Sequence, residues 1–106
     1  MTAVKFLYCK DMIKGFSVTG HSTKNSEDEN GRLVCAAISS AAYMTVNTLT
    51  EIIMAECEIS DEDGFLSVNL KNKISESQAI IKGFKLHIEG LCDEYNKNIK
   101  IESEEK

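Results

Sequence analysis

The chain has 106 residues and a formal charge of −5 at neutral pH, with 17 acidic and 12 basic residues. A length of this order favours one domain, which we expect to span residues 1–106. The acidic balance argues against a general nucleic-acid binder or a binder of anionic membranes, because both classes are normally basic. No uninterrupted apolar run approaches the roughly 20 residues of a membrane-spanning helix, and we expect a cytoplasmic protein.

The first 21 residues indicate a β-hairpin. Residues 3–9 are rich in β-formers, and residues 13–19 alternate between apolar and polar side chains with one slip. That slip predicts a bulge at Gly15, because an extra residue shifts the alternation by one place. The second strand then ends at Gly20 and His21.

A polar segment and a helical pattern follow. Residues 22–31 contain no apolar side chain, which is typical of a solvated surface loop and also of a loop that carries function. From Leu33 to about Glu56, apolar residues recur every three or four positions, so we expect a helix. Its first half is rich in alanine and serine, and small side chains let a helix approach a sheet closely. This helix is expected to be the central, buried one.

The second half of the chain repeats this outline. Asp63 and Gly64 predict a tight turn between strands at residues 57–60 and 65–70. Ser75 and Gln78 match a capping box, which predicts a second amphipathic helix from there to about residue 95. A short edge strand at residues 99–101 and a frayed charged tail at 101–106 complete the chain.

The predicted order of elements is ββαββα. We therefore expect an α/β (α+β) fold of two layers, with a mainly antiparallel sheet and both helices packed on one of its faces.

The residue types at the two ends of the polar segment indicate thiol chemistry. Cys35 is predicted in the first turn of the central helix, where free backbone N–H groups and the helix dipole favour a thiolate. His21 would then pair with that thiolate, protonate the leaving amine and activate water. The N–H groups near Cys35 could form an oxyanion hole, Ser39 lies one helical turn further on, and Arg32 adds positive charge.

Other interpretations of the same residues remain open at this point. Cys35 beside two alanines is also what a small buried core residue looks like, and His21 could be an ordinary residue at a strand end. A zinc site at His21 and Cys35 lacks a second Cys or His at ligand spacing, and no CxxC pair is present, so we predict no metal and no cofactor. Three further cysteines have no neighbouring histidine or activating setting and are predicted to be structural: Cys9, Cys57 and Cys92. His87, in the last helix, is predicted to be a helix-surface or interface residue.

The pattern Gly20-His21, a polar loop, then Val34-Cys35-Ala36-Ala37-x-Ser39 resembles the ribosomal-processing cysteine protease family Prp. The resemblance extends over nearly the whole chain. It implies a bacterial, cytosolic, homodimeric protease that removes an N-terminal extension from the precursor of large-subunit ribosomal protein twenty-seven. It also implies that Cys35 is the nucleophile and His21 the base, without a cofactor.

One position departs from the family pattern. Family members usually carry an acidic residue three positions before the cysteine, where this chain has Arg32. If that acid orients the histidine in relatives, its role here is unfilled or passes to Glu27, Asp28 or Glu29. The departure sustains a second hypothesis, a non-catalytic module of the same fold that binds a ribosomal protein during assembly.

Overall fold

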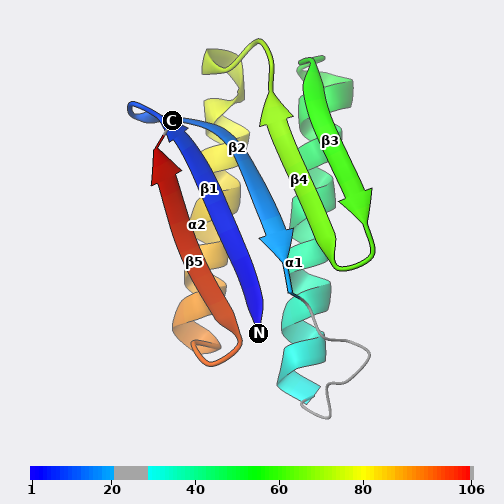
Figure 1. Ribbon diagram of the computed structural model, residues 1–106, viewed down its shortest axis with the longest axis vertical. Coiled ribbons are helices and arrows are strands. Elements are labelled where there is room, and N and C mark those ends of the chain that lie inside the picture. The colour runs from blue at the N-terminus through cyan, green and yellow to red at the C-terminus, as the bar shows by residue number, and fades with distance from the viewer. Residues whose placement is uncertain (21–28, 106) are drawn as a thin grey trace.

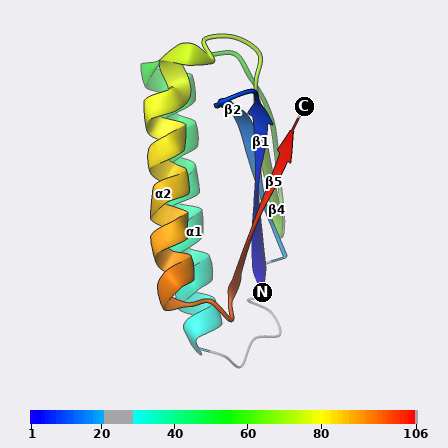
Figure 2. The same cartoon turned by 90° about the vertical axis from the view of Figure 1, so that its left-hand side faces the viewer.

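The computed structural model describes residues 1–20 and 29–105. A five-stranded sheet forms one layer, and two helices lie together on one of its faces (Figures 1 and 2). The predicted two-layer, mainly antiparallel architecture is confirmed. The short edge strand expected at residues 99–101 is a full fifth strand, so the order is ββαββαβ. The elements are β1 (Thr2–Cys9), β2 (Met12–Thr19), α1 (Glu29–Asn47), β3 (Cys57–Glu62), β4 (Phe65–Leu70), α2 (Gln78–Glu94) and β5 (Ile99–Glu105).

The strand order β3-β4-β2-β1-β5 explains why both helices share a face. Strands β2 and β4 are antiparallel neighbours, and the chain leaves them in opposite directions along the sheet: α1 leads from β2 to β3, and α2 leads from β4 to β5. Both connections are right-handed crossovers (Figure 1). Because β2 and β4 run in opposite directions and their crossovers lead toward opposite edges of the sheet, two crossovers of the same hand place their helices on the same face.

The first hairpin contains the predicted irregularity. The register between β1 and β2 shifts between Leu7, which pairs with Gly15, and Tyr8, which pairs with Ile13. The extra residue of the bulge is therefore Lys14, immediately before the predicted position. Gly15 itself is required by a close approach, because a Cβ there would collide with the carbonyl oxygen of Val68 on β4.

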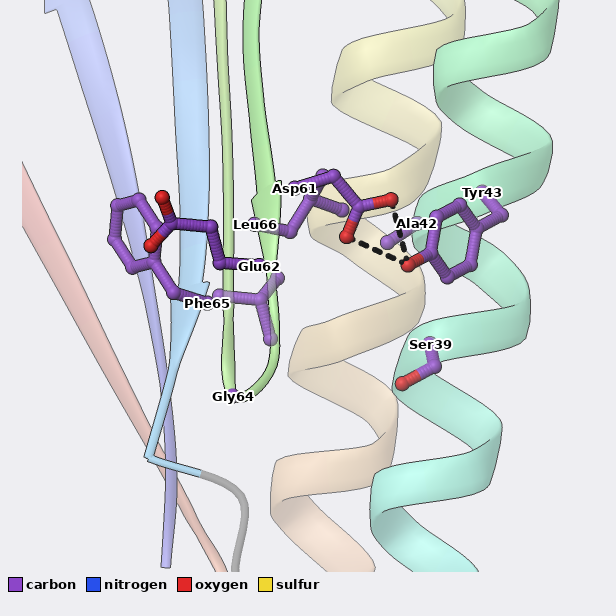
Figure 3. A pocket seen from close by; sticks show the side chains of 9 residues that line it. Ser39, Ala42, Tyr43, Asp61, Glu62, Gly64, Phe65 and Leu66 are labelled. Atoms are coloured by element: carbon purple, nitrogen blue, oxygen red, sulfur yellow. Dashed lines mark hydrogen bonds between the residues drawn. The ribbon is translucent and has the colours of Figure 1, made fainter.

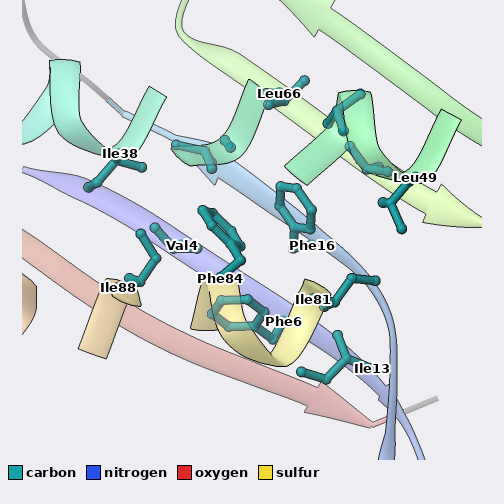
Figure 4. Packing of buried hydrophobic residues seen from close by; sticks show 14 of the residues in the cluster. Val4, Phe6, Ile13, Phe16, Ile38, Leu49, Leu66, Ile81, Phe84 and Ile88 are labelled. Carbon is teal, nitrogen blue, oxygen red and sulfur yellow. The ribbon is translucent and has the colours of Figure 1, made fainter. Parts of the chain in front are cut away.

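Three phenylalanine rings form the centre of the core between the sheet and α2. The ring of Phe84 on α2 lies 4.7 Å from that of Phe16 and 5.9 Å from that of Phe6, between centroids. All three are almost completely buried (Figure 4). Large aromatic side chains that interlock in this way dominate the energetics of a core this small.

The second hairpin forms as predicted. Gly64 adopts a φ of 79° in the turn between β3 and β4, a conformation that favours glycine. Alternate side chains of β4 are buried against the helices: Leu66, Val68 and Leu70.

Helix α1 begins at Glu29, four residues before the predicted start at Leu33. It ends at Asn47 and continues as one wider π-helical turn over Thr48–Ile52, short of the predicted end near Glu56. By length and composition alone, the stretch 29–52 is long and apolar enough to cross a membrane. In this fold, however, its inner side chains Ile38 and Leu49 are fully buried against the sheet, which is typical of a core helix.

The predicted capping box at the start of α2 is wrong. Ser75 lies inside a 3₁₀ turn (Ser75–Ser77), and the helix begins at Gln78 without a side-chain cap. The amide of Gln78 instead reaches across to β2, where it accepts from the N–H of Ile13 (2.8 Å) and donates to its carbonyl oxygen (2.9 Å). The side chain of Gln78 therefore joins the N-terminal end of α2 to the sheet.

Residues 101–105 belong to a strand, contrary to the prediction of a frayed tail from residue 101. Strand β5 continues to Glu105 and pairs in parallel with β1 along its whole length. The carboxylate of Glu105 accepts a hydrogen bond from the backbone N–H of Lys10 (3.0 Å). Backbone pairing with an existing strand satisfies these polar groups and does not require apolar side chains.

Candidate active site

Three segments converge at one end of the molecule: the end of β2, the turn between β3 and β4, and the beginning of α1 (Figure 1). Gly20, directly after β2, has a φ of 80°, and a Cβ there would lie 3.1 Å from the carbonyl oxygen of Met1. Its N–H donates to the carbonyl oxygen of Gly64 in the β3–β4 turn (3.3 Å). A glycine at this position thus lets the chain leave the sheet next to the hairpin turn.

His21, Glu27 and Asp28 lie outside the described residues. The pairing of His21 with Cys35, and the choice of an acid that orients His21, therefore stay predictions. What the structure describes is the frame on either side of them, the end of β2 and the beginning of α1, at the same end of the fold (Figure 1).

Cys35 lies deeper in α1 than predicted. Because the helix begins at Glu29, Cys35 is its seventh residue and not part of the first turn. The free N–H groups of a helix belong to its first four residues, here 29–32, so the N–H of Cys35 falls in the hydrogen-bonded part. The predicted placement of Cys35 in the first turn is therefore wrong, and the oxyanion hole expected from backbone N–H groups near Cys35 stays a prediction. The side chain is 9% exposed and faces inward with Val34.

Two of the predicted supporting residues, Arg32 and Ser39, lie on α1. Ser39, one helical turn after Cys35, is half-buried, and its side chain points from α1 toward the β3–β4 hairpin (Figure 3). Arg32 is exposed. The helix thus brings Cys35 and Ser39 to one side, as the spacing of four residues predicts.

A small pocket lies between α1 and the β3–β4 hairpin, with about 50 Å³ of space, and Ser39 is part of its lining (Figure 3). Its inner side chains are Val18 from β2, Ala42 from α1 and Leu66 from β4, all of them buried. Phe65 and Glu62 of the hairpin point to the opposite face of the sheet (Figure 3). The pocket therefore has an apolar floor and a hydroxyl on one wall.

One wall of this pocket is a hydrogen bond between the two layers. The phenol of Tyr43 donates to the carboxylate of Asp61 on β3, at 3.0 Å from Oδ1 and 3.1 Å from Oδ2. This bond is the largest cause that raises the pKa of Tyr43 above its ordinary value, followed by burial and the charge of Asp61. Tyr43 was not identified from the sequence as a site residue, because its partner lies 18 positions away on another element and no local pattern reveals the pair.

The cysteines differ in their surroundings. All four lie in the described part of the chain and are free thiols. Cys9 is exposed, whereas Cys57 and Cys92 are half-buried and lie 3.8 Å and 3.7 Å from the backbone carbonyl oxygens of Ala55 and Ile99. Burial raises the pKa of the Cys57 thiol. Among residues 1–20 and 29–105, no three His, Cys, Asp or Glu side chains lie close enough to hold a metal ion.

Comparison with known families decides the assignment. The sequence model of the family "Cysteine protease Prp" matches residues 1–100. The chain belongs to this cysteine protease family. Among curated proteins, no sequence matches.

Solved structures share the fold of this Prp family member over its whole length. The essential ribosomal processing protease Prp of Staphylococcus aureus, in complex with a substrate peptide, superimposes with a TM-score of 0.87 at 18% identity, covering 98% of this chain and 100% of the other. The same protease with a covalently linked product peptide gives 0.82 at 19% identity, with the same coverage. SMU.848 of Streptococcus mutans gives 0.84 at 21% identity, covering 100% of this chain and 96% of the other.

Proposed function

We propose that this chain is an endopeptidase that removes the N-terminal extension of the precursor of large-subunit ribosomal protein twenty-seven in the bacterial cytoplasm. The observation that carries the proposal is the match of the Prp family model over residues 1–100. The S. aureus protease of the same fold is a ribosomal processing protease seen with a substrate peptide. We take residues 1–106 as a single protease domain.

In the proposed mechanism, the Cys35 thiolate attacks the carbonyl carbon of the scissile peptide bond, with His21 as its proton partner. The tetrahedral intermediate collapses as His21 donates a proton to the leaving amine, which leaves a thioester between Cys35 and the acyl half of the substrate. His21 then takes a proton from water, whose oxygen attacks the thioester and releases a carboxylate and the free thiol. The reaction requires no cofactor.

The test is cleavage of the extended precursor by purified protein, followed by mass spectrometry of the substrate. We expect the wild type to shorten the precursor at one bond, and Cys35→Ala and His21→Ala to leave it intact. Cys57→Ala is the matched control, because it removes a cysteine of the same fold that has no role in the mechanism. Complete cleavage by Cys35→Ala would rule out the assignment.

A second candidate function is a non-catalytic module that binds the same ribosomal protein. The observation in its favour is the position of Cys35, buried within the second turn of α1. Alkylation by iodoacetamide at neutral pH distinguishes the two functions. The protease predicts that Cys35 reacts faster than Cys57, whose burial keeps it protonated. The module predicts that Cys35 is the slowest of the four.

We also propose that the protein forms a homodimer through the outer face of α1. Leu33 and Met44 are 56% and 54% exposed, and the smaller Ala37 and Ser40 lie between them at helical spacing. A dimer would cover this apolar stripe. Light scattering after gel filtration should show a dimer that Met44→Glu dissociates, whereas Leu86→Glu on α2 leaves it intact. A wild-type monomer would contradict this proposal.

A further inference from the structure

The pocket between α1 and the β3–β4 hairpin has no role in the reaction as described so far. Two of its lining residues adjoin the candidate site. Ser39, in its lining, is one helical turn from Cys35, and Gly64, also in its lining, accepts the hydrogen bond of Gly20, the residue before His21. The pocket therefore lies beside residues that adjoin both members of the proposed dyad.

The side chains of the pocket indicate what it can hold. Val18 and Leu66 are 7% exposed and Ala42 is fully buried, so its floor is apolar and already dehydrated. An apolar side chain placed there gains the free energy of burial, about 25 cal/mol per Å² of apolar surface. A carboxylate would lose its hydration and would also meet the negative charge of Asp61 at the rim, so acidic side chains are disfavoured.

The hydrogen bond between Tyr43 and Asp61 fixes the width of the pocket. Tyr43 comes from α1 and Asp61 from β3, so the bond joins the two elements that form the walls (Figure 3). A helix and a strand cannot share a backbone ladder, so side chains must hold α1 against β3 at this point. Loss of the bond would let the Tyr43 ring turn outward and open the pocket to water.

We propose that this pocket is the subsite that binds one apolar side chain of the substrate peptide beside the scissile bond, and that Tyr43, held by Asp61, is its specificity-determining wall. The inference rests on the proposed protease function. Under this proposal, the β3–β4 hairpin and the pocket-lining turn of α1 select the cleavage sequence, whereas Cys35 carries out the chemistry.

The experiment uses octapeptides that span the junction of the precursor, each position replaced in turn by Ala, Leu, Lys or Glu. Cleavage by the wild type gives kcat/KM, and binding to Cys35→Ser by fluorescence anisotropy gives affinity without reaction. We expect one position at which Leu is preferred over Glu by about tenfold or more, as apolar pockets usually discriminate. Tyr43→Ala should abolish this preference at that position only, Tyr43→Phe should reduce it, and Ala42→Val should shift it toward smaller side chains.

Leu86→Ala on the outer face of α2 is the control, because Leu86 is 70% exposed and does not line the pocket. Thermal unfolding of each variant separates altered selectivity from loss of fold. No preference at any position, or a preference that survives Tyr43→Ala, would overturn the subsite. Such a result would leave the proposed cleavage by Cys35 unaffected. Conversely, cleavage by Cys35→Ala would refute the proposed protease function, but it would not affect the binding preference, which is measured separately.

Discussion

Helices α1 and α2 cover the same face of the same sheet, yet they are built for different tasks. Helix α2 buries three large side chains, Ile81, Phe84 and Ile88, and is tied to β2 by Gln78. Helix α1 buries mainly smaller residues and presents Cys35, Ser39 and Tyr43 at intervals of one turn. The difference indicates that α2 supplies the larger side chains of the core, whereas the residues that we propose for the chemistry and for the pocket lie on α1.

The aromatic contact of α2 should give the largest effect. Phe84→Ala removes the ring that contacts both Phe6 and Phe16, and we expect a loss of about 3–5 kcal/mol in the free energy of unfolding. Urea denaturation measures this loss. Leu86→Ala, two positions along but 70% exposed, is the matched control and should change stability by less than about 0.5 kcal/mol. Equal effects of the two variants would contradict the assignment of stability to the inner face of α2.

The hydrogen bonds between Gln78 and Ile13 should give the second-largest effect on stability. Gln78→Ala leaves the N–H and carbonyl oxygen of Ile13 without their side-chain partners in a half-buried place, which costs about 1–3 kcal/mol. Gln78→Glu keeps an acceptor for the N–H and loses the donor to the carbonyl, so it should fall between Gln78→Ala and the wild type. The same denaturation series checks this order. A loss from Gln78→Ala no larger than that from Leu86→Ala would show that the bridge does not contribute.

The glycines on the outer face of α2 should give a smaller effect of opposite sign. Gly83 and Gly90 are exposed in the helix interior, and a Cβ added at either position would have open space for 4 Å around it within the described chain. Each change to Ala should therefore raise stability by about 0.5–1 kcal/mol through a reduced loss of backbone entropy. Thermal unfolding measures the gain. A destabilised variant would reveal a contact that this surface makes with another chain.

The smallest effect on stability is expected on α1. Tyr43→Phe removes one exposed hydrogen bond, so the free energy of unfolding should change by less than about 0.5 kcal/mol while peptide selectivity changes. Because the pKa of Tyr43 is raised in the folded state, its contribution is fully present below the ordinary tyrosine pKa of about 10 and is lost as pH rises through the folded value. Stability differences between wild type and Tyr43→Phe should therefore be constant near neutral pH and vanish only in strongly alkaline solution. A difference that changes between about pH 6 and pH 8, well below that range, would contradict this assignment.

The fold was predictable where local signals agree with the tertiary structure. Asp63 and Gly64 predict the second hairpin because their turn is local, and the alternation of β4 identifies its buried face. Strand β5 was underestimated because only Ile99 and Ile101 are apolar. The rest of that strand is held by backbone pairing to β1, almost a hundred residues earlier, and the sequence does not encode that pairing locally.

The site was less predictable, for two physical reasons. The start of α1 was placed too late because residues 29–32 are polar and carry no apolar periodicity, which changed the surroundings expected for Cys35. The capping box failed because Gln78 has a better partner in Ile13, on an element that packs against it only in the folded chain. Tyr43 and Asp61 were missed as a pair for the same reason.

The most direct test of the central claim is to trap the covalent intermediate on Cys35. The protein is mixed with extended precursor, quenched in acid within a turnover, and digested for mass spectrometry. The mechanism predicts a thioester that joins the N-terminal extension to the peptide containing Cys35, absent from Cys35→Ala and present in Cys57→Ala. Cleavage of the precursor without any adduct on Cys35, or with the adduct on another cysteine, would contradict it.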